Sequence, residues 1–308
     1  MPLARPFAQI DVFSAMPCAG NPVAVVLDGQ GLDAAAMQRF ARWTNLSETT
    51  FVLPPTEPAA DYALRIFTPG GELPFAGHPT LGSCFAWLAA GGQPQRGDVI
   101  VQQCAKGLVP IRRQAVDGRE RLAFAAPPST RSDPSPVVLA QVAQALGVPA
   151  AQVQRAQLLD NGPAWLTLQL DNADTVLALE PDHAQLARLG QKVGVAGIHQ
   201  AQGALLLIAR SSREARAFTA AAGREAAPLI EVRAFAAPIG VTEDPVTGSL
   251  NASLAQWLIA AGELPASYIA AQGTALGRAG RVHVERDADG QVWVGGDCVR
   301  VVQGEVLL

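Results

Sequence analysis

The chain has 308 residues, enough for about two domains of ordinary size, and its 27 acidic and 23 basic residues leave a formal net charge of −4. Hydrophobic residues make up 49% of the sequence and charged residues 16%, which predicts extensive burial and excludes intrinsic disorder. Only Lys106 and Lys192 are lysines, and the arginines are scattered. A nucleic-acid groove or a membrane-surface helix needs concentrated positive charge, so we expect neither a nucleic-acid nor a membrane partner.

Short alternating or β-branched runs predict strands in the first part of the chain. In chain order they cover residues 7–14, 22–27, 49–53, 62–68, 98–104 and 108–113. The stretch from Asp33 to Thr44 has apolar residues at helical spacing and predicts a helix with Asp33 as its N-cap. Residues 124–136 are rich in Pro and Ser without periodicity, which predicts a linker and a domain boundary near it.

The second part of the chain repeats this order of elements. A helix is predicted over 136–146, and strands are predicted over 164–170, 204–209, 232–237, 281–286, 291–294 and 299–303. Strands outnumber helices and do not alternate with them regularly. This pattern argues against a doubly wound parallel sheet.

One internal correspondence relates the two parts. Residues Gly77–Gly91 and Gly248–Gly262 each span 15 residues, begin with a glycine and a polar residue, end in Ala-Ala-Gly, and contain no charged residue. A helix that is apolar or small on every side is typical of a helix buried all round, and the final glycine is typical of its C-terminal cap. We infer two similar domains, each built around one central helix.

The two helix starts are candidate anion sites, because their first N–H groups have no partner within the helix and lie at the positive end of the helix dipole. Gly77 and Gly248 permit close backbone approach. If the domains face each other, both starts converge on one cleft. The alternative is that two unrelated glycines begin two core helices.

Polar residues near these starts each admit a functional and a structural interpretation. His78 at a buried helix start is expected to be neutral, as a donor or acceptor or as a core histidine bonded to the backbone. Asp244 and Glu243 precede the second start, where they cap the helix, hold a turn or transfer protons. Glu48 begins an apolar strand, which predicts a raised pKa suited to a general base, or it is a surface glutamate. Ser249 has no histidine at hydrolase spacing.

Other signatures are absent from the sequence. The four cysteines and four histidines have no metal-ligand spacing, and no phosphate-loop or dinucleotide motif occurs, so we expect neither a metal nor a cofactor. The first residues contain no apolar signal segment, so we expect a cytoplasmic protein with reduced thiols.

Several motifs occur in a fixed order over nearly the whole chain. They are Asp11-Val-Phe, Gly20-Asn-Pro-Val-Ala-Val-Val, Asn45-Leu-Ser-Glu-Thr-Thr-Phe-Val, Phe67-Thr-Pro, Glu72-Leu-Pro-Phe-Ala-Gly-His-Pro-Thr, Glu243-Asp-Pro-Val-Thr-Gly-Ser, Gln272-Gly and Gly277-Arg. Together they resemble the PhzF family, the phenazine-biosynthesis isomerase-like proteins, which share the diaminopimelate epimerase fold.

The resemblance implies an α+β fold of two pseudo-symmetric domains, each a β-sheet curled round a central helix, with the active site in the cleft between them. The expected domains are residues 1–122 and 123–308, and a return of the last strand to the first domain is left open. The resemblance also implies a homodimer and no cofactor.

The family's proton-transferring glutamate falls on Glu48, and its active-site histidine, aspartate and serine fall on His78, Asp244 and Ser249. The substrate carboxylate is expected at the helix starts, against the three residues Gly77, Thr247 and Gly248.

A related branch, the two-thiol epimerases and proline racemases, carries a cysteine before each helix-start glycine, where this chain has Ala76 and Thr247. Thiol-based racemisation is therefore not expected. The leading hypothesis is a cofactor-independent isomerase that moves a proton between carbons of a small carboxylate-bearing substrate, of the dihydro-hydroxyanthranilate isomerase type. The alternatives are an epimerase or racemase of a small acid, and a catalytically silent binding protein.

Overall fold

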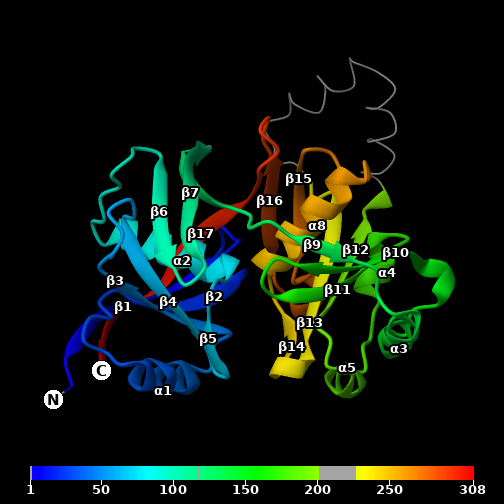
Figure 1. Ribbon diagram of the computed structural model, residues 1–308, viewed down its shortest axis with the longest axis horizontal. Coiled ribbons are helices and arrows are strands. Elements are labelled where there is room, and N and C mark those ends of the chain that lie inside the picture. The colour runs from blue at the N-terminus through cyan, green and yellow to red at the C-terminus, as the bar shows by residue number, and fades with distance from the viewer. Residues whose placement is uncertain (1, 117, 201–226) are drawn as a thin grey trace.

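The computed structural model describes residues 2–116, 118–200 and 227–308 and shows two lobes side by side (Figure 1). The predicted strand 204–209 lies outside the described residues. The helices are α1 Ala34–Thr44, α2 Gly77–Ala89, α3 Pro136–Leu146, α4 Ala173–Leu177, α5 His183–Leu189 and α8 Gly248–Ala260. The strands are β1 Ala4–Val12, β2 Asn21–Val26, β3 Glu48–Leu53, β4 Tyr62–Thr68, β5 Gly71–Leu73, β6 Val99–Cys104, β7 Gly107–Val116, β8 Arg119–Ala125, β9 Thr130–Ser132, β10 Val153–Asp160, β11 Ala164–Leu170, β12 Val193–Ile198, β13 Ile230–Ala236, β14 Val241–Asp244, β15 Ser267–Gln272, β16 Gly280–Arg286 and β17 Val292–Leu307.

The first lobe is a closed barrel. Its strands pair in the cyclic order β1, β2, β3, β4, β6, β7, β8, β17 and back to β1. Helix α2 packs directly on the barrel wall, since a Cβ on Gly82 would lie 2.4 Å from Cγ1 of Val23 and 2.9 Å from Cγ2 of Val12. Only a glycine allows the helix this close to β1 and β2.

The second lobe repeats the pairing pattern of the first. Its strands pair in the order β10, β11, β12, β13, β15, β16 and β17. Two of these pairings are parallel, β11 with β12 and β13 with β15, and the other four are antiparallel. The same six relations run from β1 to β8 in the first lobe. Short β14 pairs with β13 as β5 pairs with β4, and each precedes its central helix. The expected pseudo-symmetric α+β fold is confirmed.

The two central helices are α2 and α8, as the internal repeat predicts. Each has 13 residues and is buried along most of its length. Gly91 and Gly262 follow their C-terminal ends with φ of 95° and 74°, the left-handed conformation that glycine adopts without strain. The lack of charge in both sequences follows from this burial, because only the last turns of the two helices are partly exposed.

Strand β17 belongs to both lobes. Its first part pairs with β16 and β8, and its last part pairs with β1. The sequence predicts two strands here, over 291–294 and 299–303, and that break is wrong. Gly295 and Gly296 mark close approach and not a turn, because a Cβ on them would lie 2.6 Å from O of Leu122 and 2.5 Å from Cδ1 of Phe13.

The predicted linker over 124–136 is only partly irregular. Residues 124–125 complete β8, and 130–132 form β9, which pairs with β10. Such short strands are stabilised by backbone pairing and leave no periodic pattern in the sequence. Residues 122 and 123 lie within β8. We propose that the domain division follows the two lobes, with β17 contributing to both.

The predicted helices over 33–44 and 136–146 correspond to α1 and α3, and Asp33 caps α1 by accepting from N of Ala36. The sequence pattern does not predict strands β8, β10, β12 and β15, nor the short strands β5, β9 and β14. None of the helices in the described part of the chain has the length and hydropathy of a membrane-spanning segment.

Candidate active site

The starts of α2 and α8 touch each other where the two lobes meet. A Cβ on Gly248 would lie 3.0 Å from Cα of Gly77, and a Cβ on Gly77 would lie 3.1 Å from Cα of Gly248. Both glycines are buried. Any larger residue at either position would push the helix starts apart, so the two glycines allow both sets of free N–H groups to meet at one place.

Neither of these two buried helix starts has a side-chain cap. The residues before them, Ala76 and Thr247, make no capping hydrogen bond. By contrast, Asp33, Asn172 and Asp182 cap α1, α4 and α5 through their side-chain oxygens. Helix α3 also lacks a side-chain cap, but it begins with Pro136, which has no N–H group to satisfy. The starts of α2 and α8 differ from all of these in being uncapped, buried and in contact with each other. Uncapped N–H groups at the positive ends of two helix dipoles are suited to binding a carboxylate.

Glu48 and His78 are in direct contact at the start of α2. Glu48 is the first residue of β3, His78 is the second residue of α2, and Oε2 of Glu48 lies 3.2 Å from Nε2 of His78. Both atoms are buried, and neither has a hydrogen bond that meets the usual geometry. The side chain of Glu48 is 14% exposed and that of His78 is 4% exposed, so this pair is close to solvent only on the glutamate side.

Burial keeps both groups uncharged near neutral pH. Burial, and after it the nearby Asp244 carboxylate, raise the pKa of Glu48 to about 8. Burial also lowers the pKa of His78 to about 3, against a hydrogen bond to the Pro22 carbonyl that favours the imidazolium. These shifts agree with the two expectations from the sequence, a neutral His78 and a raised pKa for Glu48. A neutral carboxyl group that faces a neutral imidazole can share one proton with it.

Asn21 indicates which nitrogen of His78 carries the hydrogen. Its Nδ2 lies 2.8 Å from Oδ1 of Asp244, 2.9 Å from O of Val246 and 3.4 Å from Nδ1 of His78. An amide has two hydrogens, and the two shorter contacts use both. We therefore assign the hydrogen of the imidazole to Nδ1, bonded to the Pro22 carbonyl, which leaves the lone pair of Nε2 facing Glu48.

Asp244 lies at the end of β14 and is joined to the first lobe through Asn21. Besides the Asn21 amide, it accepts a 2.6 Å hydrogen bond from Oγ1 of Thr247. Burial raises the pKa of Asp244 to about 6, although these two hydrogen bonds favour its ionised form. Asp244 binds the threonine hydroxyl and does not cap α8, so the capping interpretation is wrong. Glu243 is paired with Arg233, with oxygen–nitrogen distances of 2.9 and 2.8 Å.

Ser249 occupies in α8 the position that His78 occupies in α2. Its Oγ accepts a 3.2 Å hydrogen bond from Nε1 of Trp165, and its carbonyl accepts one of 2.9 Å from Nδ2 of Asn161. Ser249 is 8% exposed. The structure thus places Glu48, His78, Asp244 and Ser249 around the adjoining helix starts, together with Gly77, Thr247 and Gly248.

Other polar residues of the site were not singled out by sequence reasoning. Gln272 accepts from N of Thr247 at 3.0 Å and donates to the Asp244 carbonyl at 3.1 Å, so it fixes the loop before α8. Asn21 is placed by Asp11, whose Oδ2 accepts from N of Ala19 and Gly20 at 2.8 and 2.9 Å. Asn21, Asp11 and Gln272 all lie in the motifs that carry the family resemblance, and this membership is the sequence feature from which they could have been selected as site residues.

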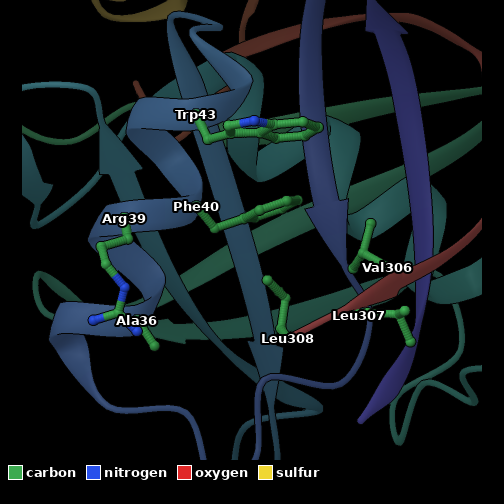
Figure 2. A pocket seen from close by; sticks show the side chains of 7 residues that line it. All are labelled: Ala36, Arg39, Phe40, Trp43, Val306, Leu307 and Leu308. Carbon is green, nitrogen blue, oxygen red and sulfur yellow. The ribbon is translucent and has the colours of Figure 1, made fainter. Parts of the chain in front are cut away.

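A hollow elsewhere on the first lobe does not belong to this site. Figure 2 shows Phe40 and Trp43 of α1 opposite the last residues of the chain, Val306 to Leu308. Of its lining side chains only Arg39 is ionisable. The hollow therefore lacks the carboxylates and the imidazole that the helix starts bring together.

The profile of the family described as "phenazine biosynthesis-like protein" matches residues 10–304 of the chain. The chain belongs to this family. It is 36% identical to antisense-enhancing sequence 1 of Schizosaccharomyces pombe, over 98% of this chain and 98% of that protein. It is 31% identical to the trans-2,3-dihydro-3-hydroxyanthranilate isomerase of Pseudomonas aeruginosa, over 98% and 99%.

A solved structure shows the same fold. The PhzF-family phenazine biosynthesis protein of Bacillus anthracis superposes with a TM-score of 0.80, covering 99% of this chain and 100% of its own, at 21% identity. The expected membership of the PhzF family and the expected diaminopimelate epimerase-like fold are confirmed. The curated relatives include proteins named as isomerases, and the expectation of an isomerase is confirmed at that level.

Proposed function

We propose that the chain is a cofactor-independent isomerase that moves a proton between two carbons of a small carboxylate-bearing substrate. The observation that carries this proposal is the contact between Glu48 and His78 at two uncapped helix starts. A desolvated carboxyl group with a pKa of about 8 is suited to proton transfer near neutral pH, because its pKa is close to the pH of the solution.

The substrate carboxylate would bind to the free N–H groups at Gly77 and Gly248 and their neighbours. Each helix end contributes roughly half a positive charge, so two adjoining ends balance about one carboxylate. Thr247 is held between Asp244 and Gln272, which fixes the turn that presents the α8 start. The carboxylate orients the substrate and also lowers the cost of forming negative charge on the adjacent carbon.

Glu48, in its ionised form, would remove the proton from the substrate carbon. The proton would then stay on Oε2 of Glu48, 3.2 Å from the lone pair of Nε2 of His78, which orients the carboxyl group until the proton returns to the second carbon. His78 is bonded through Nδ1 to the Pro22 carbonyl and so stays in one orientation. Asp244 is the second candidate for returning a proton, which it would do in its protonated form, and burial raises its pKa to about 6 and so increases the fraction in that form.

A direct test uses trans-2,3-dihydro-3-hydroxyanthranilate, the substrate in the name of the Pseudomonas aeruginosa relative, in heavy water. An isomerase with an exchanging base incorporates deuterium into a product whose double bonds have moved, which proton and deuterium NMR detect. Inversion of a stereocentre without a bond shift would identify an epimerase, as chiral chromatography shows. A silent binding protein would bind the acid and incorporate no deuterium.

Three further features are part of the proposal. We propose that activity survives dialysis against a chelator, that the protein is a homodimer as the family resemblance implies, and that it is cytoplasmic. All four cysteines are free, which supports a reducing compartment. Light scattering coupled to size exclusion tests the dimer, and cell fractionation tests the location.

A further inference from the structure

A lysine lies at the place in the second lobe that Glu48 holds in the first. Strand β12 corresponds to β3, because each runs parallel to the strand before it and antiparallel to the strand after it. Glu48 and Thr50 face α2, since Oγ1 of Thr50 contacts Oγ of Ser83 at 2.8 Å. Lys192 and Gly194 face α8, since a Cβ on Gly194 would lie 2.4 Å from Cδ1 of Leu250. Lys192 thus stands two residues before the helix contact, as Glu48 does.

Trp165 places the ammonium group of Lys192 beside the start of α8. Lys192 precedes β12 and is the cross-strand neighbour of Trp165, because its carbonyl accepts from N of Leu166 at 2.8 Å. Its Nζ lies 5.5 Å from the centre of the Trp165 ring, a cation–π distance. Nε1 of the same ring donates to Oγ of Ser249. The lysine, the indole and the helix start therefore form one connected group.

The charge of Lys192 is not matched by an ion-pair partner among the described residues of the site. Its electrostatic neighbours are Asp160 and Glu48. Asp160 is exposed and its Oδ1 accepts from N of Gly162, and Glu48 is held protonated by burial. Among the described residues, no carboxylate oxygen forms an ion pair with Lys192 within 4 Å. Burial lowers the pKa of Lys192, so keeping the charge here costs free energy that an anionic ligand would offset.

We propose, resting on the isomerase function above, that Lys192 contacts the substrate and that the substrate is a small dicarboxylic acid. One carboxylate lies at the paired helix starts and the second on the Lys192 ammonium, with Glu48 between them. The two half-charges of the helix ends balance the first carboxylate and the lysine balances the second. Neither the family name nor the name of a relative implies this second acidic group.

The test is calorimetric titration with acids of matched length at pH 7 and constant ionic strength. Succinate is compared with butyrate, and glutarate with valerate. The parent protein is expected to bind at least one diacid about tenfold more tightly than its matched monoacid. This ratio of dissociation constants corresponds to the contribution of one charge-assisted hydrogen bond. Lys192→Met is expected to abolish this ratio while its monoacid affinity changes less than about twofold.

Lys106→Met is the matched control, because Lys106 is the only other lysine and lies in the exposed turn between β6 and β7. It should keep the full ratio. Lys192→Gln repeats the comparison if the methionine variant melts early. If monoacids bind and diacids show no preference, or if Lys192→Met keeps the preference, the dicarboxylate inference is overturned and the isomerase proposal stands. If neither the monoacids nor the diacids bind, carboxylate binding at the helix starts fails, and both proposals fall.

Discussion

Gly77 and Gly248 lie so close that a single added methyl group on Gly248 would come within 3.0 Å of Cα of Gly77 and 3.3 Å of N of His78. The backbone of one helix start thus forms a wall for the other. These two residues, 171 positions apart in the sequence, can lie this close because neither has a side chain.

Gly248→Ala is expected to separate the helix starts and to weaken carboxylate binding by more than about tenfold, because the N–H groups no longer point to one place. Overpacking of this kind costs about 1–3 kcal/mol of stability. Gly304→Ala is the control, since a Cβ there meets nothing within 4 Å. Titration with butyrate and melting curves check both variants, and unchanged affinity in Gly248→Ala would contradict the two-helix anion site.

Glu48→Gln is expected to lower the rate of deuterium exchange by about 10²–10⁴-fold, because an amide does not accept a proton at neutral pH. Its stability should change by only about 1 kcal/mol, since the two side chains have nearly the same shape. Affinity for the acid should persist, because the helix starts hold the carboxylate. Exposed Glu57→Gln serves as the control. Exchange at the parental rate would remove Glu48 as the base and make Asp244 the next candidate.

The pH dependence of stability provides a separate check on Glu48. Its pKa is raised from 4.5 to about 8, so between these values the folded chain holds a proton that the unfolded chain has lost. Stability therefore falls as pH rises through this window. Urea unfolding from pH 5 to 8.5 should show a steeper fall for the parent than for Glu48→Gln. Parallel curves would mean that the carboxyl is not desolvated.

The pKa of about 8 for Glu48 also predicts the pH profile of activity. If Glu48 must be ionised to accept the proton, kcat/KM should rise with pH and level off above about 8. A profile that is flat from pH 6 to 9 would exclude Glu48 as a base with this raised pKa.

Thr247→Val removes the hydroxyl that donates to Asp244 at 2.6 Å. That hydrogen bond favours the ionised carboxylate, so the pKa of Asp244 should rise above about 6 in the variant. If ionised Asp244 takes part in the reaction, the acid limb of the pH profile should move upward, whereas exposed Thr130→Val should leave it in place. A lower rate with an unshifted profile would indicate only a structural role for the Thr247 hydroxyl.

Local patterns in the sequence predict many of the elements, and motif order predicts the fold. The charge-free stretches that become α2 and α8 are the clearest case, because burial on every side leaves its mark on composition. The glycine pair in β17 is the opposite case, since glycines required by close packing look like glycines required by a turn.

Some residues of the site could be selected from the sequence and others could not. Glu48, His78, Asp244 and Ser249 could be selected because family motifs contain them, although local pattern alone left each one ambiguous. Asn21 and Gln272 stand in the same motifs, but their roles depend on hydrogen bonds to residues far away in the sequence. Lys192 stands in no motif, and its place beside the helix start depends on the repeat of the whole strand order.

Strand β17 has a consequence for how the chain acquires its structure. The first barrel lacks its closing strand until residues 292–307 arrive, although the preceding strand of that barrel, β8, ends at Ala125. During synthesis, β1 and β8 therefore present open hydrogen-bonding edges while the whole second lobe is still being made, and open edges invite association with other chains. Closure of the first lobe through such distant contacts makes folding slow and couples it to the second lobe.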